Sequence, residues 1–247
     1  MVNNINIKKV HDPIGLINGK YHEFAGTFDG GYNTIKNLQI NSCQFGGLFG
    51  LIGSTATVKN LNITDAKLDG EYSYVGTVAG KSFGLIDKVM IENPDINNTA
   101  KDSFTGGVVG SLISDSTSFN SASIFRTGVH NSKEDLCIIA NGTLGGLAGI
   151  ASDSRIHACY TNVTLKNTSN KYTGGLTGEF IVDKASKIYE SYTICNIDSK
   201  GPSGNISGEI RVDTTSSVDS IDKSLVLVGL YFNSEINEYT AFARDNW

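Results

Sequence analysis

The sequence has little proline, little charge and no long apolar run. Only 3 of the 247 residues are proline and 18% are charged, and Lys+Arg 20 against Asp+Glu 25 gives a net charge of −5. Because no basic cluster interrupts this even scatter, the chain lacks the attraction that nucleic-acid backbones require, and we expect no nucleic-acid partner. Nowhere do 18 uncharged apolar residues follow one another, so we expect no insertion into a membrane.

The chain also lacks the usual metal-binding and catalytic spacings. Its four cysteines, at positions 43, 137, 159 and 195, form no CxxC pair, and no His-rich segment accompanies them. This spacing argues against a zinc site and favours four free, buried thiols. The HExxH motif of zinc peptidases is absent as well. We therefore predict no catalytic residues and no cofactor.

What is abundant is glycine, together with Asn, Ser, Thr and Ile. The 28 glycines and 39% hydrophobic residues are typical of a chain with many short strands and turns around a continuous core. A five-residue unit of Gly, any residue, an apolar residue, any residue and Gly recurs as GTFDG, GGLFG, GTVAG, GGVVG, GGLAG, GGLTG and GNISG. The closing glycines stand at positions 30, 50, 80, 110, 149, 178 and 208. A fixed period of this kind is typical of solenoid proteins.

Each unit carries a second apolar segment, and aligning these segments gives three columns. The first column is Ile35, Val58, Ile86, Ile124, Ile156, Ile188 and Ile221. The second is Leu38, Leu61, Val89, Thr127, Cys159, Ser191 and Ser224, and the third is Ile40, Ile63, Ile91, Val129, Thr161, Thr193 and Val226. The spacing alternates as in half-buried strands, so all three columns should face inward. The later members of the second column predict ladders of small hydroxyl groups that bond from coil to coil.

These observations predict an all-β fold, a single-domain right-handed parallel β-helix of about seven coils. The β-helix should span residues 24–230, with residues 1–23 as an N-terminal cap or first partial coil and residues 231–247 as a C-terminal cap or linker. We expect the motif glycines to be needed because the chain bends sharply there and only glycine takes positive φ without a steric cost.

The repeats resemble the GLUG repeat family of bacterial surface and adhesin-like proteins. The resemblance rests on FAGTFDGGYNTIKNLQI at residues 24–40, on the repeated GGL-x-G units, and on GLYFNSEIN at residues 229–237. It implies a β-solenoid scaffold of a secreted or cell-surface bacterial protein, with a role in virulence, and one that forms part of a larger multidomain chain. The first 13 residues contain no apolar stretch of signal-peptide length, so we expect either that a leader has been removed or that export follows a route without a cleavable leader.

Four aspartates recur just after the closing glycines and predict a column on the turns of four successive coils. They are Asp115, Asp153, Asp183 and Asp213. Carboxylates stacked this closely repel one another unless hydrogen bonds or a cation neutralise them. Caps of their own turns, a calcium site and paired catalytic carboxylates are three interpretations of this column.

A second candidate site is aromatic. Two outward positions hold Phe125, His157 and Tyr189 on one side and Tyr160 and Tyr192 on the other. If the inward columns are right, these rings form one exposed patch on adjacent coils, and their flat faces suit sugar rings or protein loops. The alternative is that the rings cover the outer sheet, or that a loop such as residues 133–136 covers them.

Taken together, these features favour a non-catalytic binding or adhesion module that recognises a glycan or a host protein through a lateral face of the rod. One alternative is a polysaccharide lyase or hydrolase, for which Asp153 with Arg155 is the only compact candidate in the sequence. Another is a secreted effector domain that acts inside host cells, which agrees with four unpaired cysteines.

Overall fold

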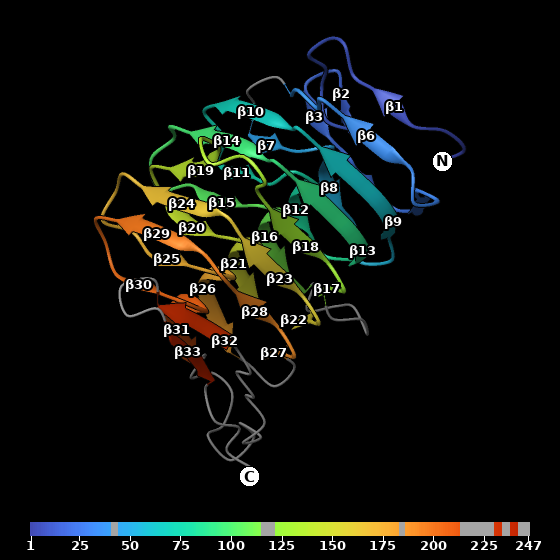
Figure 1. Cartoon of the computed structure of the whole chain (residues 1–247). Coiled ribbons are helices and arrows are strands. Elements are labelled where there is room, and N and C mark those ends of the chain that lie inside the picture. The colour runs from blue at the N-terminus through green and yellow to red at the C-terminus, as the bar shows by residue number, and fades with distance from the viewer. Residues whose placement is uncertain (41–43, 115–121, 183–185, 213–229, 234–237, 242–247) are drawn as a thin grey trace.

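The computed structural model describes residues 1–40, 44–114, 122–182, 186–212, 230–233 and 238–241. In this part of the chain every regular element is a β-strand. The strands build a parallel β-solenoid of about six turns, as the repeat predicts (Figure 1). Among the same residues, no helix is long and apolar enough to cross a membrane.

Each turn of the solenoid passes through four sheets, which we number 1 to 4. Sheet 1 is the largest and has eleven strands. They are β1 (Ile5–Asn6), β5 (Thr27–Asp29), β6 (Thr34–Lys36), β9 (Thr57–Thr64), β13 (Leu85–Glu92), β17 (Ala122–Phe125), β18 (Gly128–His130), β22 (Ser154–His157), β23 (Tyr160–Asn162), β27 (Lys187–Tyr189) and β28 (Tyr192–Thr193). We count the turn that contains β9 as the first turn and the turn that contains β13 as the second. In the third to fifth turns, a pair of short strands takes the place of this one long strand.

Sheets 2, 3 and 4 complete the turn. Sheet 2 consists of β10 (Lys67–Gly70), β14 (Asp95–Asn98), β19 (Cys137–Ala140), β24 (Thr164–Asn167) and β29 (Asn196–Ser199). Sheet 3 consists of β7 (Phe45–Gly46), β11 (Tyr74–Val75), β15 (Phe104–Gly106), β20 (Thr143–Gly145), β25 (Thr173–Gly174) and β30 (Ser203–Gly204). Sheet 4 consists of β4 (Glu23–Phe24), β8 (Phe49–Ile52), β12 (Ala79–Ser82), β16 (Val109–Ile113), β21 (Ala148–Ser152), β26 (Thr177–Val182) and β31 (Ser207–Val212).

Two antiparallel hairpins lie outside these four sheets. The first joins β2 (Leu16–Ile17) to β3 (Lys20–Tyr21), and the second joins β32 (Leu230–Asn233) to β33 (Glu238–Ala241). Before the first hairpin, β1 already pairs in parallel with β6. The N-terminal residues therefore stack on the solenoid as a partial turn.

The first of the seven glycine units is not equivalent to the others, which corrects the predicted number of coils. The six later units stack in sheet 4, for example with Phe49 opposite Ala79. The GTFDG unit instead forms β5 in sheet 1, where Phe28 pairs with Val58 and Ile35 pairs with Ile63. An interval of 20 residues is too short for a turn that takes about 30 elsewhere, so both β5 and β6 lie beside β9. The structure has about six turns rather than about seven.

The three inward columns are confirmed wherever the structure describes them. Every described member is buried, with at most 4% of its surface exposed. The seventh members, Ile221, Ser224 and Val226, lie outside the described residues. The core changes from aliphatic to polar along the second column, because Leu and Val in the early turns give way to Thr127, Cys159 and Ser191.

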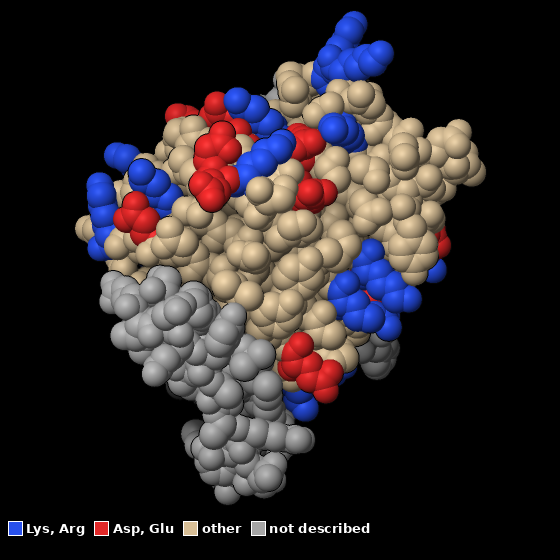
Figure 2. Space-filling model, viewed as in Figure 1, with Lys and Arg blue, Asp and Glu red and all other residues tan. Residues whose placement is uncertain are grey.

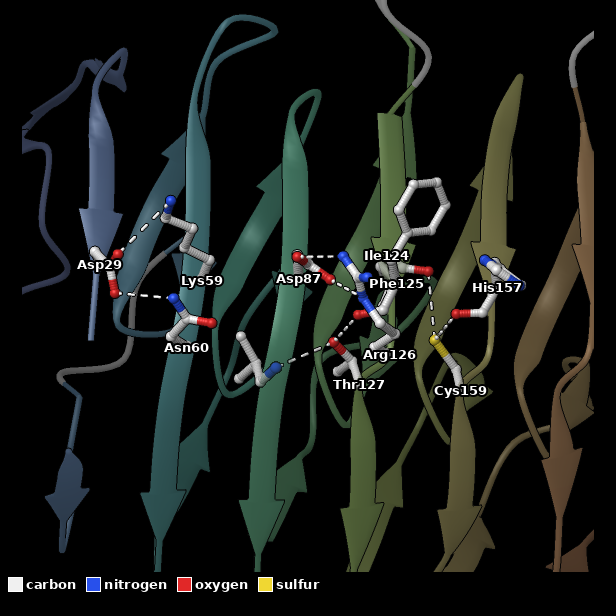
Figure 3. A network of polar contacts seen from close by, with 11 residues as sticks. Asp29, Lys59, Asn60, Asp87, Ile124, Phe125, Arg126, Thr127, His157 and Cys159 are labelled. Atoms are coloured by element: carbon white, nitrogen blue, oxygen red, sulfur yellow. Dashed lines mark hydrogen bonds and ion pairs between the residues drawn. The ribbon is translucent and has the colours of Figure 1, made fainter. Parts of the chain in front are cut away.

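The hydroxyl groups of Thr127 and Ser191, in this column, form hydrogen bonds with backbone N–H and C=O groups of the strands. Thr127 Oγ1 donates to the carbonyl of Phe125 at 2.8 Å and accepts the N–H of Val89, in the preceding turn, at 3.3 Å (Figure 3). Ser191 does the same with the carbonyl of Tyr189 and the N–H of Cys159, at 2.9 and 3.1 Å. The predicted side-chain ladder forms one column further on, where Thr161 donates to Thr193 at 2.9 Å.

We expect Thr127→Val to lower the free energy of unfolding by about 1–3 kcal/mol, because a buried N–H and a buried carbonyl both lose their partner. Thr127→Ser keeps the hydroxyl and removes one methyl group, so it should cost about 0.8 kcal/mol. Urea unfolding of the two variants measures the difference. A valine variant as stable as the serine variant would show that these two bonds contribute nothing.

The motif glycines are required for a different reason from the one expected. Among the described units, only Gly47 has a φ in the range that side chains rarely adopt, at 151°. Most of the others leave room for nearby backbone atoms, whereas Gly46 and Gly50 leave room for tyrosine rings and Gly26 has only an ordinary contact. A Cβ added to Gly174 would lie 1.9 Å from the carbonyl oxygen of Thr177, and one added to Gly76 would lie 2.4 Å from that of Val108. Close approach of backbone atoms explains most of these glycines better than positive φ does; the atoms belong to the same unit at Gly174 and to the next turn at Gly76.

Candidate functional site

The outer surface of sheet 1 carries two columns of rings on the third to fifth turns. Phe125, His157 and Tyr189 are in register on β17, β22 and β27. Tyr160 and Tyr192 are in register on β23 and β28, and His130 on β18 adds a sixth ring. We call the two sets the first and second ring columns. The structure thus brings all five predicted aromatic residues to one side of the solenoid.

The rings of each column pack on one another. His157 and Tyr189 stack with ring centres 4.0 Å apart and planes 10° apart, and Tyr160 and Tyr192 stack at 5.5 Å and 12°. Phe125 meets His157 edge to face at 5.7 Å. Because neighbouring rings use their faces on each other, the columns present ring edges and polar atoms outward. The sequence predicted flat ring faces that are free to contact a ligand. In the structure these faces are largely occupied by neighbouring rings.

The ring of Tyr160 lies across the preceding turn, and a glycine makes room for it. A Cβ added to Gly128 would lie only 2.2 Å from Cε1 of Tyr160. The Tyr160 hydroxyl comes within 3.4 Å of His130 Nδ1, and the two rings stack at 6.3 Å. Burial raises the pKa of Tyr160, with smaller contributions from Tyr192 and Glu92. Tyr160 is half-buried, whereas Tyr192 is 38% exposed.

Between the two columns, each strand is bent by a residue in the left-handed conformation. These residues are Asn60, Lys88, Arg126, Ala158 and Glu190, with φ of 52, 55, 47, 53 and 50°. A non-glycine residue in this region costs roughly 1–2 kcal/mol. The bend separates the first ring column from the second and fixes the angle between them.

The bend residues also connect successive turns through polar contacts (Figure 3). Arg126 donates two hydrogen bonds to the Asp87 carboxylate, from Nε at 2.8 Å and from an Nη at 2.7 Å. This contact raises the pKa of Arg126. One further pair lies beside the rings, where His157 Nε2 is 2.8 Å from Glu190 Oε2. Each contact joins an outward residue of one turn to the bend residue of the next. These contacts hold the strands that carry the ring columns in position relative to one another.

Figure 2 shows that few charged side chains lie over β18, β23 and β28, while acidic and basic groups lie around the margin of this area. The loop at 131–136 does not close over Tyr192. Its Lys133 Nζ lies 2.7 Å from Asp65 Oδ1, and the Ser132 N–H donates to Asn93 Oδ1 at 2.9 Å. The loop is thus tied to the preceding turns and leaves Tyr192 exposed.

No family model, curated protein or solved structure matches this chain. The structure supports the β-solenoid that the GLUG resemblance implies. Assignment to that family, and with it the adhesin role, stays a prediction.

The predicted aspartate column can be followed at only one position. Asp115, Asp183 and Asp213 lie outside the described residues. Asp153 is described; it has a φ of 46°, and its carbonyl accepts a hydrogen bond from the Ser114 hydroxyl. In the part of the chain that is described, no three His, Cys, Asp or Glu side chains gather closely enough to hold a metal ion. Calcium binding stays a prediction.

The cysteines differ in how deeply they are buried, whereas the sequence predicted that all four are buried. Cys159 is buried, Cys137 and Cys195 are half-buried, and all three are free, while Cys43 lies outside the described residues. Burial raises the pKa of Cys159 to about 12, so this thiol stays protonated at neutral pH. Its sulfur lies 3.2 Å from the carbonyl oxygen of His157, in the place that Thr127 and Ser191 occupy in neighbouring turns. This contact indicates a structural role for Cys159.

A second aromatic column, on sheet 3, was missed by sequence reasoning. Phe45, Tyr74 and Phe104 stack with ring centres 5.6 and 5.5 Å apart, and Lys81 Nζ lies 3.9 Å from the centre of the Tyr74 ring. The signal was present, because an aromatic residue stands one or two places before the opening glycine in three successive units. All three rings are half-buried.

The structure also brings together a carboxylate pair that was not foreseen. Glu179 and Glu209 are in register on β26 and β31, each directly after a closing glycine. Arg211 pairs with both, and its Nε lies 3.8 Å from Glu209 Oε2. The guanidinium balances two like charges on adjacent turns, so the arrangement is that of a structural ion-pair network.

Proposed function

We propose that this chain is a non-catalytic binding module of a secreted or bacterial cell-surface protein, and that it recognises a neutral glycan along the outer face of sheet 1. The observation that carries the proposal is the pair of ring columns, of which the first is in register over three turns and the second over two. Tyr and His rings combine an apolar body with a polar edge, and stacked rings lose little conformational entropy on binding. Such positions are typical of the residues that contribute most to binding.

The geometry favours a glycan over a protein loop for two reasons. The outward ring edges and hydroxyls repeat at the strand spacing of roughly 4.8 Å, and a linear glycan also repeats its hydroxyl groups regularly. The area over β18, β23 and β28 carries few charges, and the chain is acidic overall. Both properties suit an uncharged partner better than an acidic one.

A glycan array tests the proposal. We expect the chain to be retained by a subset of neutral oligosaccharides, and the signal to survive 0.5 M salt because contacts between uncharged groups are not screened. Retention only by acidic glycans, with loss at high salt, would contradict it. Retention only by proteins on a parallel protein array would favour the protein-binding alternative. Shortening of a retained glycan, detected by mass spectrometry, would favour the lyase or hydrolase alternative.

A further inference from the structure

A surface pocket of about 160 Å³ lies beside the second ring column. It occupies the corner where β23 and β28 lead into β24 and β29, so its lining begins two residues beyond Tyr160 and two residues beyond Tyr192. Its lining is Asn131, Ser132, Lys133, Glu134, Leu136, Asn162, Val163, Thr164, Ile194 and Asn196. None of these residues belongs to the ring columns.

The 131–136 loop forms one wall of the pocket and is held by the body of the solenoid. In addition to the ties to Asp65 and Asn93, the Asn131 side chain donates from Nδ2 to the carbonyl of Leu136 at 2.9 Å. This bond closes the loop on itself and fixes the orientation of the Asn131 amide. The wall is therefore preformed, which lowers the entropic cost of binding.

The rest of the lining indicates which ligand fits. Asn, Ser and Thr side chains provide amides and hydroxyls, while Leu136, Val163 and Ile194 provide short aliphatic surface. The lining contains two charged residues, Lys133 and Glu134. Lys133 is paired with Asp65, so it does not neutralise the Glu134 carboxylate. A cavity of roughly 150 Å³ accommodates benzene, so this open pocket can take part of a sugar ring and leave the rest in solvent. The geometry points to a binding site for one neutral monosaccharide unit, either a hexose or an N-acetylhexosamine.

This inference rests on the proposed function, because the pocket would hold one unit of a glycan whose neighbouring units contact the ring columns. A titration followed by ¹⁵N–¹H NMR tests it directly, with glucose, galactose, N-acetylglucosamine and glucuronic acid as probes. We expect a neutral sugar to shift the amide signals of Asn131, Asn162 and Ile194 in a saturable manner, and glucuronic acid to leave them in place. Absence of shifts at these residues with every neutral sugar would overturn the inference.

A matched pair of variants separates the pocket from the rest of the surface. Asn196→Phe places a ring at the pocket wall, and we expect it to weaken sugar binding at least tenfold. Asp198→Phe, two residues further along β29 on the same exposed side, is outside the lining and should retain binding. Equal binding by both variants would contradict the inference, and unchanged melting temperatures confirm that both are folded.

The two proposals fail in distinguishable ways. If an oligosaccharide from the array binds Asn196→Phe as tightly as the unaltered chain, the pocket inference is wrong while glycan binding stands. If single sugars saturate the pocket but no oligosaccharide is retained through the ring columns, the proposed function is wrong while the pocket stands.

Discussion

Replacing Gly145 with alanine is expected to lower the free energy of unfolding by about 3 kcal/mol or more, at the upper end of overpacking effects. The added Cβ would lie 1.9 Å from the carbonyl oxygen of Ala148 and 2.7 Å from the backbone nitrogen of Gly178. Both atoms belong to the backbone, one of them in the next turn, so a side-chain rotation cannot relieve the contact. For a chain of this length the loss corresponds to a melting temperature about 6–12 °C lower. Thermal unfolding followed by circular dichroism measures it.

Gly26 provides the matched control for this substitution. A Cβ there would meet the Phe24 ring at 3.5 Å, an ordinary contact, and the φ of Gly26 lies outside the restricted range. Gly26→Ala should therefore change stability by less than about 1 kcal/mol, in either direction. Equal losses at both positions would mean that the close approach of backbone atoms is not why the motif requires glycine.

Replacing Tyr160 and Tyr192 together with serine is expected to weaken binding of the glycan identified on the array at least tenfold. The change removes two stacked rings and their phenol edges from the second ring column, while the inward residues Thr161 and Thr193 stay in place. Two residues that act as binding hot spots contribute at least about 2 kcal/mol each. Isothermal titration calorimetry measures the affinity.

The control for the tyrosine variant lies on another sheet. Tyr74→Ser removes a ring that is stacked in the same way, at 5.5 Å from Phe104, but on sheet 3. It should cost comparable stability and leave glycan affinity unchanged. Undiminished binding by the Tyr160/Tyr192 variant, or an equal loss in Tyr74→Ser, would show that the second ring column does not form the binding surface.

The sequence was sufficient to predict the fold because this fold repeats. Each inward position is sampled once per turn, so a column such as Val58, Ile86, Ile124 and Ile156 is visible without any alignment to other proteins. Within the described turns, the predicted register was wrong in the first coil alone. There the shorter interval places Ile35 opposite Ile63, which no pattern within that single coil could show.

The site was only partly predictable, because contacts between turns depend on geometry that the period does not contain. The alternation placed Tyr160 and Tyr192 outward and in register. It could not show that their faces would pack on each other, that Gly128 would leave room for the Tyr160 ring, or that the loop around Lys133 would be tied to Asp65. The pocket could not be predicted from the sequence for the same reason, because its walls come from three separate turns of the chain.

The left-handed bend between the ring columns has one further consequence. The position tolerates an amide, an ammonium, a guanidinium, a methyl and a carboxylate in turn, at Asn60, Lys88, Arg126, Ala158 and Glu190. The backbone shape is thus held constant while the chemistry changes from turn to turn. Arg126 is bonded to Asp87, and Glu190 lies within hydrogen-bond distance of His157, so the polar groups at these two positions are already paired. The angle between the two ring columns therefore does not depend on the chemistry of the bend residue.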